Sequence, residues 1–385
     1  MQRWRAVGLV PSKNEINATP VRVVLVAPSL TILGGQAVQA DRLLRGWEGD
    51  PDVIATLLPI NPAASGAARA LQQVKYVRTL TTQAVYWPSL LAGLRRADVV
   101  HVFSASYYSF LLAAWPAVQV ARLLGKPVLM NYHSGQAPDH LARSPLARRT
   151  LGGVDGNVVP SSFLQDVFAD FGIGSRVIPN TVDLDRFRFR ERQQLRPRLV
   201  STRNFEPLYN VACTLRMFRL VQDRRPDATL VLVGGGSEEP RLRALARLLR
   251  LNGVTFAGRV PPDEIWRVYD QGDIYVQTSN IDNMPISVLE AYASGLPVVA
   301  TAAGGVPAML AHGEHGLLTP IDDHEAVAAA VFRLLADPAL TARLTTVAHE
   351  WCRSCTWPVV RRQWLDTYRS VLPRRAASRN PVTVP

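Results

Sequence analysis

Two carboxylates within residues 279–307 have the surroundings of a functional site. Asp282 lies in a loop before a predicted helix, and Glu290 lies on that helix among valine, leucine, alanine and tyrosine residues. A carboxylate on so apolar a helix is costly to bury unless hydrogen-bond donors meet it. A lone glutamate is more often a helix former on a solvated face. The apolar neighbours of Glu290 favour the other interpretation, in which it is buried and donor groups surround it.

Glycines next to predicted helices could bind the oxygen atoms of a ligand. Gly34 and Gly35 stand between a β-rich run, residues 21–27, and a segment with helical spacing, residues 36–44. Adjacent glycines before a helix let the backbone approach a ligand closely and leave N–H groups for a phosphate or sugar oxygen. A plain turn is the commoner reason for two glycines. Because the pair lacks the G-x-G-x-x-G spacing, we predict no nicotinamide site.

Other candidate residues directly follow predicted strands. His133 comes two residues after a strand at 127–131, and Arg203 comes directly after one at 199–202. In a parallel sheet such positions meet at the carboxyl edge, where ligands collect. His101 lies in the middle of a strand instead, which is typical of a satisfied core histidine.

The elements that would hold these residues alternate between strand and helix. Two series of strands are predicted, at 21–27, 52–58, 98–102, 127–131 and 157–160, and then at 199–202, 229–233, 254–257, 274–277 and 296–301. This alternation predicts parallel sheets with helices on both faces. The region between the series lacks helical periodicity and contains Pro179 and Pro197, so we place a linker there. Two α/β domains that face each other form a cleft, the usual place for a small ligand.

Composition defines the broad class of protein. The chain has 385 residues, 48% of them hydrophobic, with a mean hydropathy of +0.04, so we expect two soluble globular domains. The first twenty residues have no apolar core of signal-peptide length, and no run reaches the roughly 18 apolar residues of a membrane span. Pro116 and Gln119 interrupt the richest apolar run, residues 110–121, which predicts a core or surface-active helix.

Cysteine and histidine patterns give little sign of a metal or redox site. Cys352 and Cys355 have the spacing of a zinc or redox pair, but the chain has no second pair and the two lie late in a helical segment. We expect unreactive thiols in a reducing compartment. None of the seven histidines forms a metal-ligand motif, so we predict no protein-bound metal.

Charge is unevenly distributed along the chain. The net charge is +12, and residues 1–198 hold 23 lysines and arginines against 13 acids. Such a field attracts phosphates, so nucleic acid, anionic lipid and a phosphorylated substrate are all open. Residues 186–192 alternate basic and aromatic side chains, which suits either single-stranded nucleic acid or an interdomain strand or linker with one solvated face. We favour the second interpretation.

Taken together, these features resemble the retaining nucleotide-sugar glycosyltransferases of family 4, and the resemblance covers nearly the whole chain. Its pieces, in order, are Gly34-Gly35, VIPNTVDLDRF with Asn180 and Asp183, Arg203, VLVGGGSEE, and the D-x7-E element from Asp282 to Glu290 followed by SGLPVVATAAGG. The resemblance implies the α/β fold named GT-B, in which two Rossmann-like domains face each other across a cleft. The acceptor-side domain would span residues 1–196, rejoined by residues 357–385, and the nucleotide-sugar domain would span 197–356.

The resemblance also implies roles for the candidate residues. Glu290 would bind the ribose hydroxyls of the nucleotide, and Arg203 would neutralise charge on the departing diphosphate. Asp282 would hold the donor sugar and its diphosphate, together with backbone N–H groups of Asn283, Met284, Pro285 and Ile286 at the helix N-terminus. From the first domain, Gly34 and Gly35 would close on the diphosphate and His133 would face the donor sugar.

The chain departs from the family pattern at several positions. Asp282 stands where the family has glutamate, and Leu208 stands where it has a lysine five positions after the arginine. Losing one charge-assisted contact of about 1.5–3 kcal/mol would weaken diphosphate binding roughly ten- to a hundredfold. We predict that Arg259 substitutes for the lysine. Thr181 and Ala308 replace a common glycine and a common acidic residue.

The resemblance implies a metal-independent retaining enzyme, without a cofactor, that moves a sugar from a nucleoside diphosphate sugar to a hydroxyl of a glycan or lipid-linked acceptor. We expect it in the cytoplasm, with its basic first domain against an anionic membrane surface. The alternative is a non-catalytic relative that binds nucleotide sugars or serves as a scaffold. We expect no nucleic-acid partner.

Overall fold

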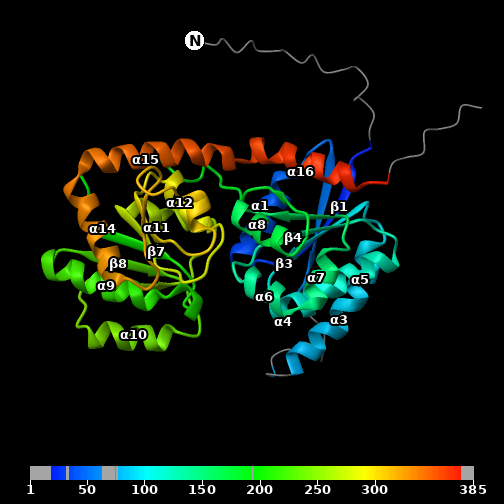
Figure 1. Ribbon diagram of the computed structural model, residues 1–385, viewed down its shortest axis with the longest axis horizontal. Helices are drawn as coiled ribbons and strands as arrows, with labels where there is room; N and C mark the ends of the chain where they lie inside the picture. The colour runs from blue at the N-terminus through cyan, green and yellow to red at the C-terminus, as the bar shows by residue number, and fades with distance from the viewer. Residues whose placement is uncertain (1–18, 32–33, 63–73, 75–76, 193, 374–385) are drawn as a thin grey trace, which may run out of the picture.

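The computed structural model describes residues 19–31, 34–62, 74, 77–192 and 194–373 (Figure 1). Within them the chain forms two parallel sheets of six strands, one in each half. Residues 1–18, most of the segment considered for a signal peptide, and residues 374–385 of the predicted acceptor-side domain lie outside this part of the chain.

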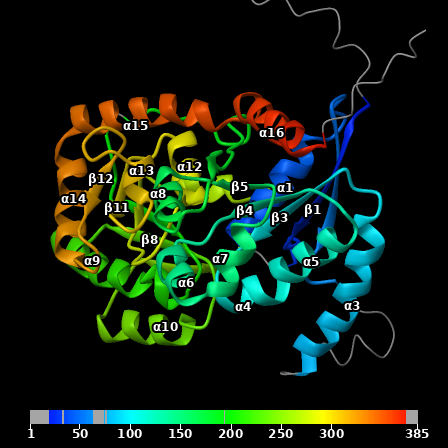
Figure 2. The ribbon, with the colours of Figure 1, turned by 45° about the vertical axis from the view of Figure 1, so that its right-hand side comes forward.

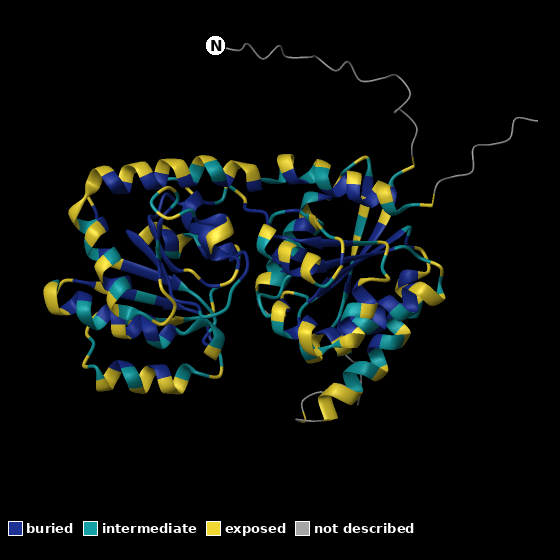
Figure 3. Ribbon diagram, in the orientation of Figure 1, coloured by how far each residue is buried: buried dark blue, intermediate teal, exposed yellow. Residues whose placement is uncertain are grey.

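The first sheet has the strand order β2-β1-β3-β4-β5-β6, and its paired strands are parallel. Its strands are β1 (Val21–Ala27), β2 (Val53–Pro59), β3 (Val99–Ser104), β4 (Val128–Tyr132), β5 (Gly156–Val159) and β6 (Arg176–Val177). Strands β3 and β4 are buried along their whole length (Figure 3). Strands covered on both faces need apolar residues throughout, which explains their continuous hydrophobic runs.

Helices cover both faces of the first sheet and form two apolar cores. The helical segments of this half are α1 (Gly35–Gly46), α3 (Val77–Leu94), α4 (Tyr107–Ser109), the π-helix η1 (Phe110–Ala114), α5 (Trp115–Leu123), α6 (Ala137–Arg143), α7 (Pro145–Leu151), α8 (Ser162–Asp170) and the last helix, α16 (Trp357–Val371). Alternate residues of each strand point to opposite cores. Val100 and Val102 pack with α3 and α5, whereas Phe103 packs with α1 and α16.

The second sheet has the order β12-β11-β10-β7-β8-β9 and is also parallel. Its strands are β7 (Arg198–Thr202), β8 (Thr229–Val233), β9 (Val254–Gly258), β10 (Ile274–Gln277), β11 (Val298–Thr301) and β12 (Leu317–Thr319). The helical segments around it are η2 (Pro207–Tyr209), α9 (Val211–Arg224), α10 (Glu239–Leu248), α11 (Trp266–Gln271), α12 (Ile286–Ala293), α13 (Val306–Met309), α14 (His324–Ala336), α15 (Pro338–Cys352) and η3 (Arg353–Cys355). All eight residues of α12 are buried.

The chain returns to the first sheet at its C-terminal end. Figures 1 and 2 show α15 running along the second half and α16 continuing past η3 to the first. There the Tyr368 hydroxyl lies 2.9 Å from His101 Nδ1, and Arg361 donates to Asp50 and Asp52 at 2.6 and 2.7 Å. Ion pairs and apolar packing therefore both bind α16 to the first half.

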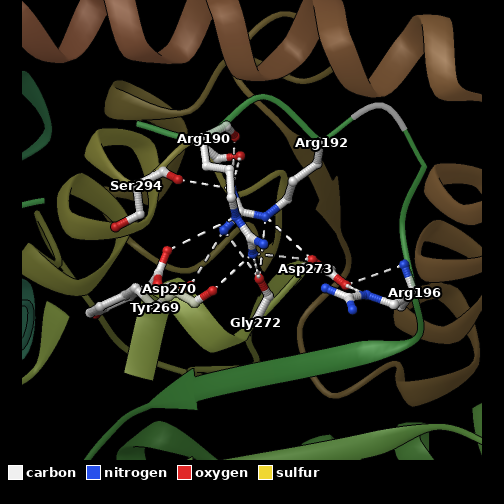
Figure 4. A network of polar contacts seen from close by, with 9 residues as sticks. Arg190, Arg192, Arg196, Tyr269, Asp270, Gly272, Asp273 and Ser294 are labelled. Atoms are coloured by element: carbon white, nitrogen blue, oxygen red, sulfur yellow. Dashed lines mark hydrogen bonds and ion pairs between the residues drawn. The ribbon is translucent and has the colours of Figure 1, made fainter. Parts of the chain in front are cut away.

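The arginine-rich linker is attached to the second half by its own guanidinium groups (Figure 4). Arg192 is buried and donates to the carbonyl oxygens of Gly272 and Ser294 at 3.2 and 2.8 Å, and it lies 3.5 Å from Asp273. Ser294 follows α12, so its carbonyl is one of those that a helix end leaves without a partner. Residues 186–192 thus form an irregular structural linker, and Arg192 points inward instead of toward solvent.

The differences from the predicted elements have local causes. The edge strands β6 and β12 contain two and three residues, too few to give a hydrophobic pattern. Residues 110–121 form a π-helix followed by α5, because Pro116 has no N–H to donate to Leu112 four residues earlier. The Leu112 carbonyl accepts from Gln83 of α3 instead, at 2.9 Å.

Candidate active site

A cavity of about 500 Å³ opens at the carboxyl edges of both sheets, and it is lined by residues from both halves of the molecule. All the site residues predicted from the sequence line it: Gly34, Gly35, His133, Arg203, Arg259, Asp282, Asn283, Met284, Pro285, Ile286 and Glu290. Each belongs to a loop that follows a strand or to the helix after such a loop. The parallel topology therefore brings them together from distant parts of the sequence.

The two halves approach each other closely at the loop around Asp282. A Cβ atom on Gly135, in the first half, would lie 2.7 Å from the Asp282 carbonyl oxygen. A Cβ atom on Gly304 would overlap the same oxygen. A Cβ on Gly35 would lie 3.6 Å from Ile286 Cδ1. Glycine at the first two of these positions allows the backbones to come into contact.

Side chains from the first half and the linker also hold this loop. Asn180 Nδ2 donates to the Met284 carbonyl at 2.8 Å, and the Ser161 hydroxyl donates to Asn283 Oδ1. Asn283 Nδ2 is buried and has no hydrogen-bond acceptor among the described residues. The loop is therefore fixed from outside the second domain.

The Asp282 carboxylate accepts hydrogen bonds from three groups. Arg203 Nη2 lies 2.5 Å from Oδ2, Gln277 Nε2 donates to the same oxygen at 3.2 Å, and the Asn283 backbone N–H donates to Oδ1 at 3.0 Å. The side chains of Asp282 and Arg203 are each 11% exposed. The Asp282 carboxylate is thus held by Arg203, Gln277 and the Asn283 backbone at the wall of the cavity.

Arg203 is held in place by its neighbours just beyond β7. Its Nη1 donates to Ser287 Oγ at 3.2 Å, and its guanidinium carbon lies 4.1 Å from the centre of the Tyr209 ring. Burial, the largest single influence, lowers the pKa of Arg203. The Asp282 carboxylate and three nearby tyrosines together outweigh burial and raise the pKa above its usual value. Nε is buried and has no acceptor within the described part of the chain, so one N–H group is left without a partner.

Glu290 lies on the buried helix α12 and meets donors from both halves. The residue is 7% exposed. Oε1 accepts from Arg42 Nη2 at 2.5 Å, and Oε2 accepts from the Tyr269 hydroxyl at 2.9 Å. Burial and the Glu290 carboxylate raise the pKa of Tyr269 well above its usual value, so Tyr269 stays a donor. The interpretation of Glu290 as buried among donors is confirmed, and the solvated-face alternative is wrong.

His133 follows β4 and ends a row of stacked rings. Its ring centre lies 5.2 Å from that of Phe103, which lies 5.0 Å from that of His101. Burial lowers the pKa of His133 to about 4 and that of His101 to about 3, so both rings are neutral at pH 7. His133 Nε2 has no partner among the described residues, whereas His101 is the core histidine that the sequence predicts.

Arg259 is an exposed cation in the wall of the cavity. It follows β9, and its side chain makes no hydrogen bond or ion pair with any residue in the described ranges. Leu208, which stands where the family has lysine, also lines the cavity and offers only an apolar side chain. Arg259 and Leu208 therefore line the same cavity, and the substitution of Arg259 for the lysine stays a prediction.

The donor set predicted for the loop is wrong in part. The Asn283 N–H donates to the side chain of Asp282, and Pro285 has no N–H. Helix α12 begins at Ile286, with Pro285 extended before it and no side chain capping the helix. The N–H groups of Ile286 and Ser287 have no acceptor within the helix, so the first turn of α12 has free donors beside the cavity.

The residues near the cavity that were not predicted from the sequence include Gln39, Arg42, Ser161 and Tyr269. Gln39 is buried on α1 and Arg42 nearly so, although that helix is amphipathic. Polar side chains on the buried side of a helix are a signal that could have identified these two. Ser161 and Tyr269 carry no comparable signal, because only the tertiary arrangement brings them to the site.

Further structural features concern metals, membranes and thiols. Within the described ranges, no three His, Cys, Asp or Glu side chains are grouped so that they could hold a metal ion. Among the helices described, none is both long and apolar enough to cross a bilayer. Cys352 and Cys355 are buried and unpaired, and burial raises the pKa of Cys355 to about 11.

Solved structures with the same arrangement define the fold. Sucrose-phosphate synthase from Thermosynechococcus elongatus superposes with a TM-score of 0.75 at 20% identity, over 91% of this chain and 98% of that chain. Anabaena Alr3699/HepE, solved in complex with UDP-glucose, superposes with a TM-score of 0.72 at 18% identity, over 91% and 99%. The fold is GT-B, with one parallel sheet in each half.

Two family models match adjacent parts of the sequence. "Glycosyltransferase Family 4" matches residues 80–186, and "Glycosyl transferases group 1" matches residues 185–351. The chain is therefore a glycosyltransferase of the family 4 type.

Two relatives illustrate the range of similar sequences. The sulfoquinovosyl transferase SQD2 of Arabidopsis thaliana is 28% identical over 253 residues, which are 60% of this chain and 48% of the relative. This chain thus spans about half the length of that protein. A GDP-mannose-dependent alpha-(1-6)-phosphatidylinositol monomannoside mannosyltransferase of Mycobacterium tuberculosis is 29% identical over 314 residues, which are 75% of this chain and 81% of the relative.

Proposed function

We propose that the chain transfers a sugar from a nucleoside diphosphate sugar to a hydroxyl group of a glycan or lipid-linked acceptor, with retention of configuration at the anomeric carbon. Residues 197–356 would hold the donor. Residues 1–196, together with residues 357–385, would hold the acceptor. Two similar proteins support a nucleoside diphosphate sugar as the donor. One is named as GDP-mannose-dependent, and the other was solved in complex with UDP-glucose.

The surroundings of Glu290 carry this proposal. An ionised carboxylate offers about four acceptor positions, and Arg42 and Tyr269 use one on each oxygen. The remaining positions on a residue that lines the cavity suit the two hydroxyls of a ribose. This accounts for a carboxylate on a buried apolar helix better than a purely structural role does.

The diphosphate of the donor would lie against the first turn of α12. The N–H groups of Ile286 and Ser287 and the helix dipole favour an anion there. Arg203 Nε has no acceptor among the described residues, and Arg259 is free of any described partner. Because Asp282 already compensates much of the charge on Arg203, Arg259 would supply the larger share of uncompensated positive charge.

The chemistry would depend on positioning and electrostatic stabilisation of the leaving group. The bond from the anomeric carbon to the acceptor oxygen would form on the face from which the phosphate leaves. The acceptor proton would pass to the leaving phosphate, as the family resemblance implies. We assign no covalent nucleophile, since Asp282 is engaged by Arg203 and Gln277. Neutral His133 would face the sugar, and no metal or cofactor is included.

The acceptor would approach from the basic first half. Residues 1–198 contain 23 lysines and arginines against 13 acids, a net positive charge that suits an anionic membrane or a lipid-linked phosphate. The mannosyltransferase relative is named for a phosphatidylinositol acceptor. We therefore propose a cytoplasmic enzyme that works at the inner face of the membrane.

A panel of nucleotide sugars and acceptors, assayed for released nucleoside diphosphate, tests the function. NMR of the product then reports whether the anomeric configuration is retained. Turnover with a retained configuration supports the proposal, and an inverted product would remove the retaining mechanism. Absence of turnover with every donor and acceptor pair would count against the enzyme.

A non-catalytic nucleotide-sugar-binding protein is the second candidate. It is favoured by Leu208 in place of the family lysine and by the ion pair that engages Arg203. Calorimetric binding of UDP-sugars or GDP-sugars without turnover on any acceptor would support this alternative.

A further inference from the structure

Arg42 reaches Glu290 from the opposite half of the molecule. It lies on α1, shortly after the Gly34-Gly35 loop, whereas Glu290 lies on α12. Arg42 Nη2 is 2.5 Å from Glu290 Oε1, and Arg42 Nη1 donates to the Thr181 carbonyl at 2.6 Å. The side chains of the pair are 15% and 9% exposed. Such an interaction is screened by solvent much less than a surface ion pair.

The surrounding hydrogen bonds restrict where the Arg42 guanidinium can lie. Gln39, on the same helix, accepts from the Thr181 N–H and donates to the Thr181 carbonyl, both at 2.9 Å. Thr181 belongs to the linker between the sheets. On the other side, Tyr269 holds the second oxygen of Glu290. The carboxylate is thus fixed between a donor from each half.

We propose that Arg42 is a positioning residue for the nucleotide, which orients the Glu290 carboxylate toward the ribose only when the first half is closed on the second. The inference rests on the proposed function, in which Glu290 binds the ribose hydroxyls. It adds a residue from the acceptor-side domain to the recognition of the donor.

The geometry favours positioning over competition for the carboxylate. Arg42 uses one acceptor position on Oε1 and leaves the other free. If Arg42 were absent, Glu290 would keep only the Tyr269 hydroxyl and could rotate away from the ribose. A rigidly held carboxylate binds a diol more tightly than a mobile one, because less freedom is lost on binding.

The ion pair also links nucleotide binding to the arrangement of the two halves. Arg42 meets Glu290 across the same boundary at which Gly135 approaches Asp282 and Gly35 approaches Ile286. A ligand that binds the closed arrangement better than an open one stabilises the closed one. Nucleotide recognition and closure therefore support each other.

Binding measurements on Arg42 variants of the full chain test the proposal. Titration calorimetry would compare UDP and GDP with their 2′,3′-dideoxy analogues, for the wild type, Arg42→Met and Arg42→Lys. The matched control is Arg45→Met on the same helix, because Arg45 is 55% exposed and pairs with Asp41 instead. Circular dichroism of each variant checks that it is folded.

The expected result is a loss of about tenfold in affinity for the ribonucleotide in Arg42→Met, the size of one charge-assisted hydrogen bond. Affinity for the dideoxy analogue should not change, Arg42→Lys should recover part of the loss, and Arg45→Met should behave as wild type. Comparing the affinity for the ribonucleotide with that for its dideoxy analogue separates an effect through the ribose hydroxyls from a general disturbance of the fold.

Three results would overturn the inference. Unchanged affinity in Arg42→Met would show that Glu290 needs no positioning, and tighter binding would show that Arg42 competes with the ribose. An equal loss for ribose and dideoxyribose ligands would show a structural effect alone. If the wild type bound neither UDP nor GDP, the proposed function would fail first and the inference with it.

Discussion

Replacing Arg259 by alanine should weaken the binding of a nucleoside diphosphate while leaving the fold intact. The side chain lines the cavity and has no hydrogen-bond or ion-pair partner among the described residues. Its removal should therefore change the free energy of unfolding by no more than about 0.5 kcal/mol. A charge-assisted contact to a phosphate contributes about 1.5–3 kcal/mol. Because Arg259 is exposed, we take the lower end, which corresponds to roughly a tenfold loss of affinity.

Calorimetry with UDP and GDP measures this loss, and the matching nucleosides serve as ligands without phosphate. Arg259→Ala should affect the diphosphates and not the nucleosides. Arg267→Ala is the control, since Arg267 is exposed on α11 outside the cavity, against the Trp266 ring. Leu208→Lys in the Arg259→Ala background should restore part of the affinity. The difference should also shrink at about 1 M salt, where the screening length is about 3 Å.

Equal diphosphate affinity for Arg259→Ala and wild type would refute this reasoning. It would show that Arg203 and the first turn of α12 are sufficient for the diphosphate. A loss of the same size for nucleosides would show that Arg259 contacts the base or ribose instead.

Three further predictions concern stability and metal dependence. Asp282→Asn should lower the free energy of unfolding by about 3 kcal/mol, because it leaves Arg203 buried without a counter-charge; an unchanged urea midpoint would contradict this. The pKa values of His101 and His133, about 3 and about 4, lie below the value of about 6.5 for a histidine in an unfolded chain. Between these values and about pH 6.5, the unfolded chain therefore binds more protons than the folded chain. The free energy of unfolding should be level above pH 6.5 and fall by up to about 1.4 kcal/mol per pH unit per histidine below it. In urea titrations at pH 7, 6 and 5, this free energy should fall less steeply with pH in His101→Gln than in the wild type. Turnover should survive dialysis against EDTA, and a loss restored by a divalent cation would show that the enzyme needs a metal.

The fold could be predicted well where hydrophobic runs are long enough to carry a pattern. The bounds of β1, β8 and β10 are those predicted, because each strand is an apolar run with a clear turn or polar residue beside it. β11 begins at Val298, two residues later than predicted, because Leu296 and Pro297 belong to the turn after α12. Very short edge strands such as β12 offer no such pattern.

The composition of the site could be predicted because a parallel sheet places the residues after its strands at one edge. This rule located His133 and Arg203 without knowledge of the tertiary structure. The contacts between the halves could not be predicted in this way. Whether Arg42 meets Glu290, or Gly135 meets Asp282, depends on how the two sheets face each other, and no local pattern in the sequence specifies that orientation.

Charge patterns were the least informative of the sequence signals. The arginines of residues 186–192 could serve a polyanion or the protein itself, and their spacing is the same in both cases. The structure shows that Arg192 satisfies carbonyl groups beside α12 and that Arg190 lies 3.4 Å from Asp273. Only the partners of each guanidinium separate the two interpretations.

Turnover of the Glu290→Ala variant tests the account most directly. With a donor and acceptor that the wild type uses, released nucleoside diphosphate would be followed for both proteins at several donor concentrations. We predict at least a tenfold lower kcat/KM for the variant, because the ribose loses its carboxylate partner. Full turnover at an unchanged KM would show that Glu290 does not bind the donor and that the site is wrongly assigned.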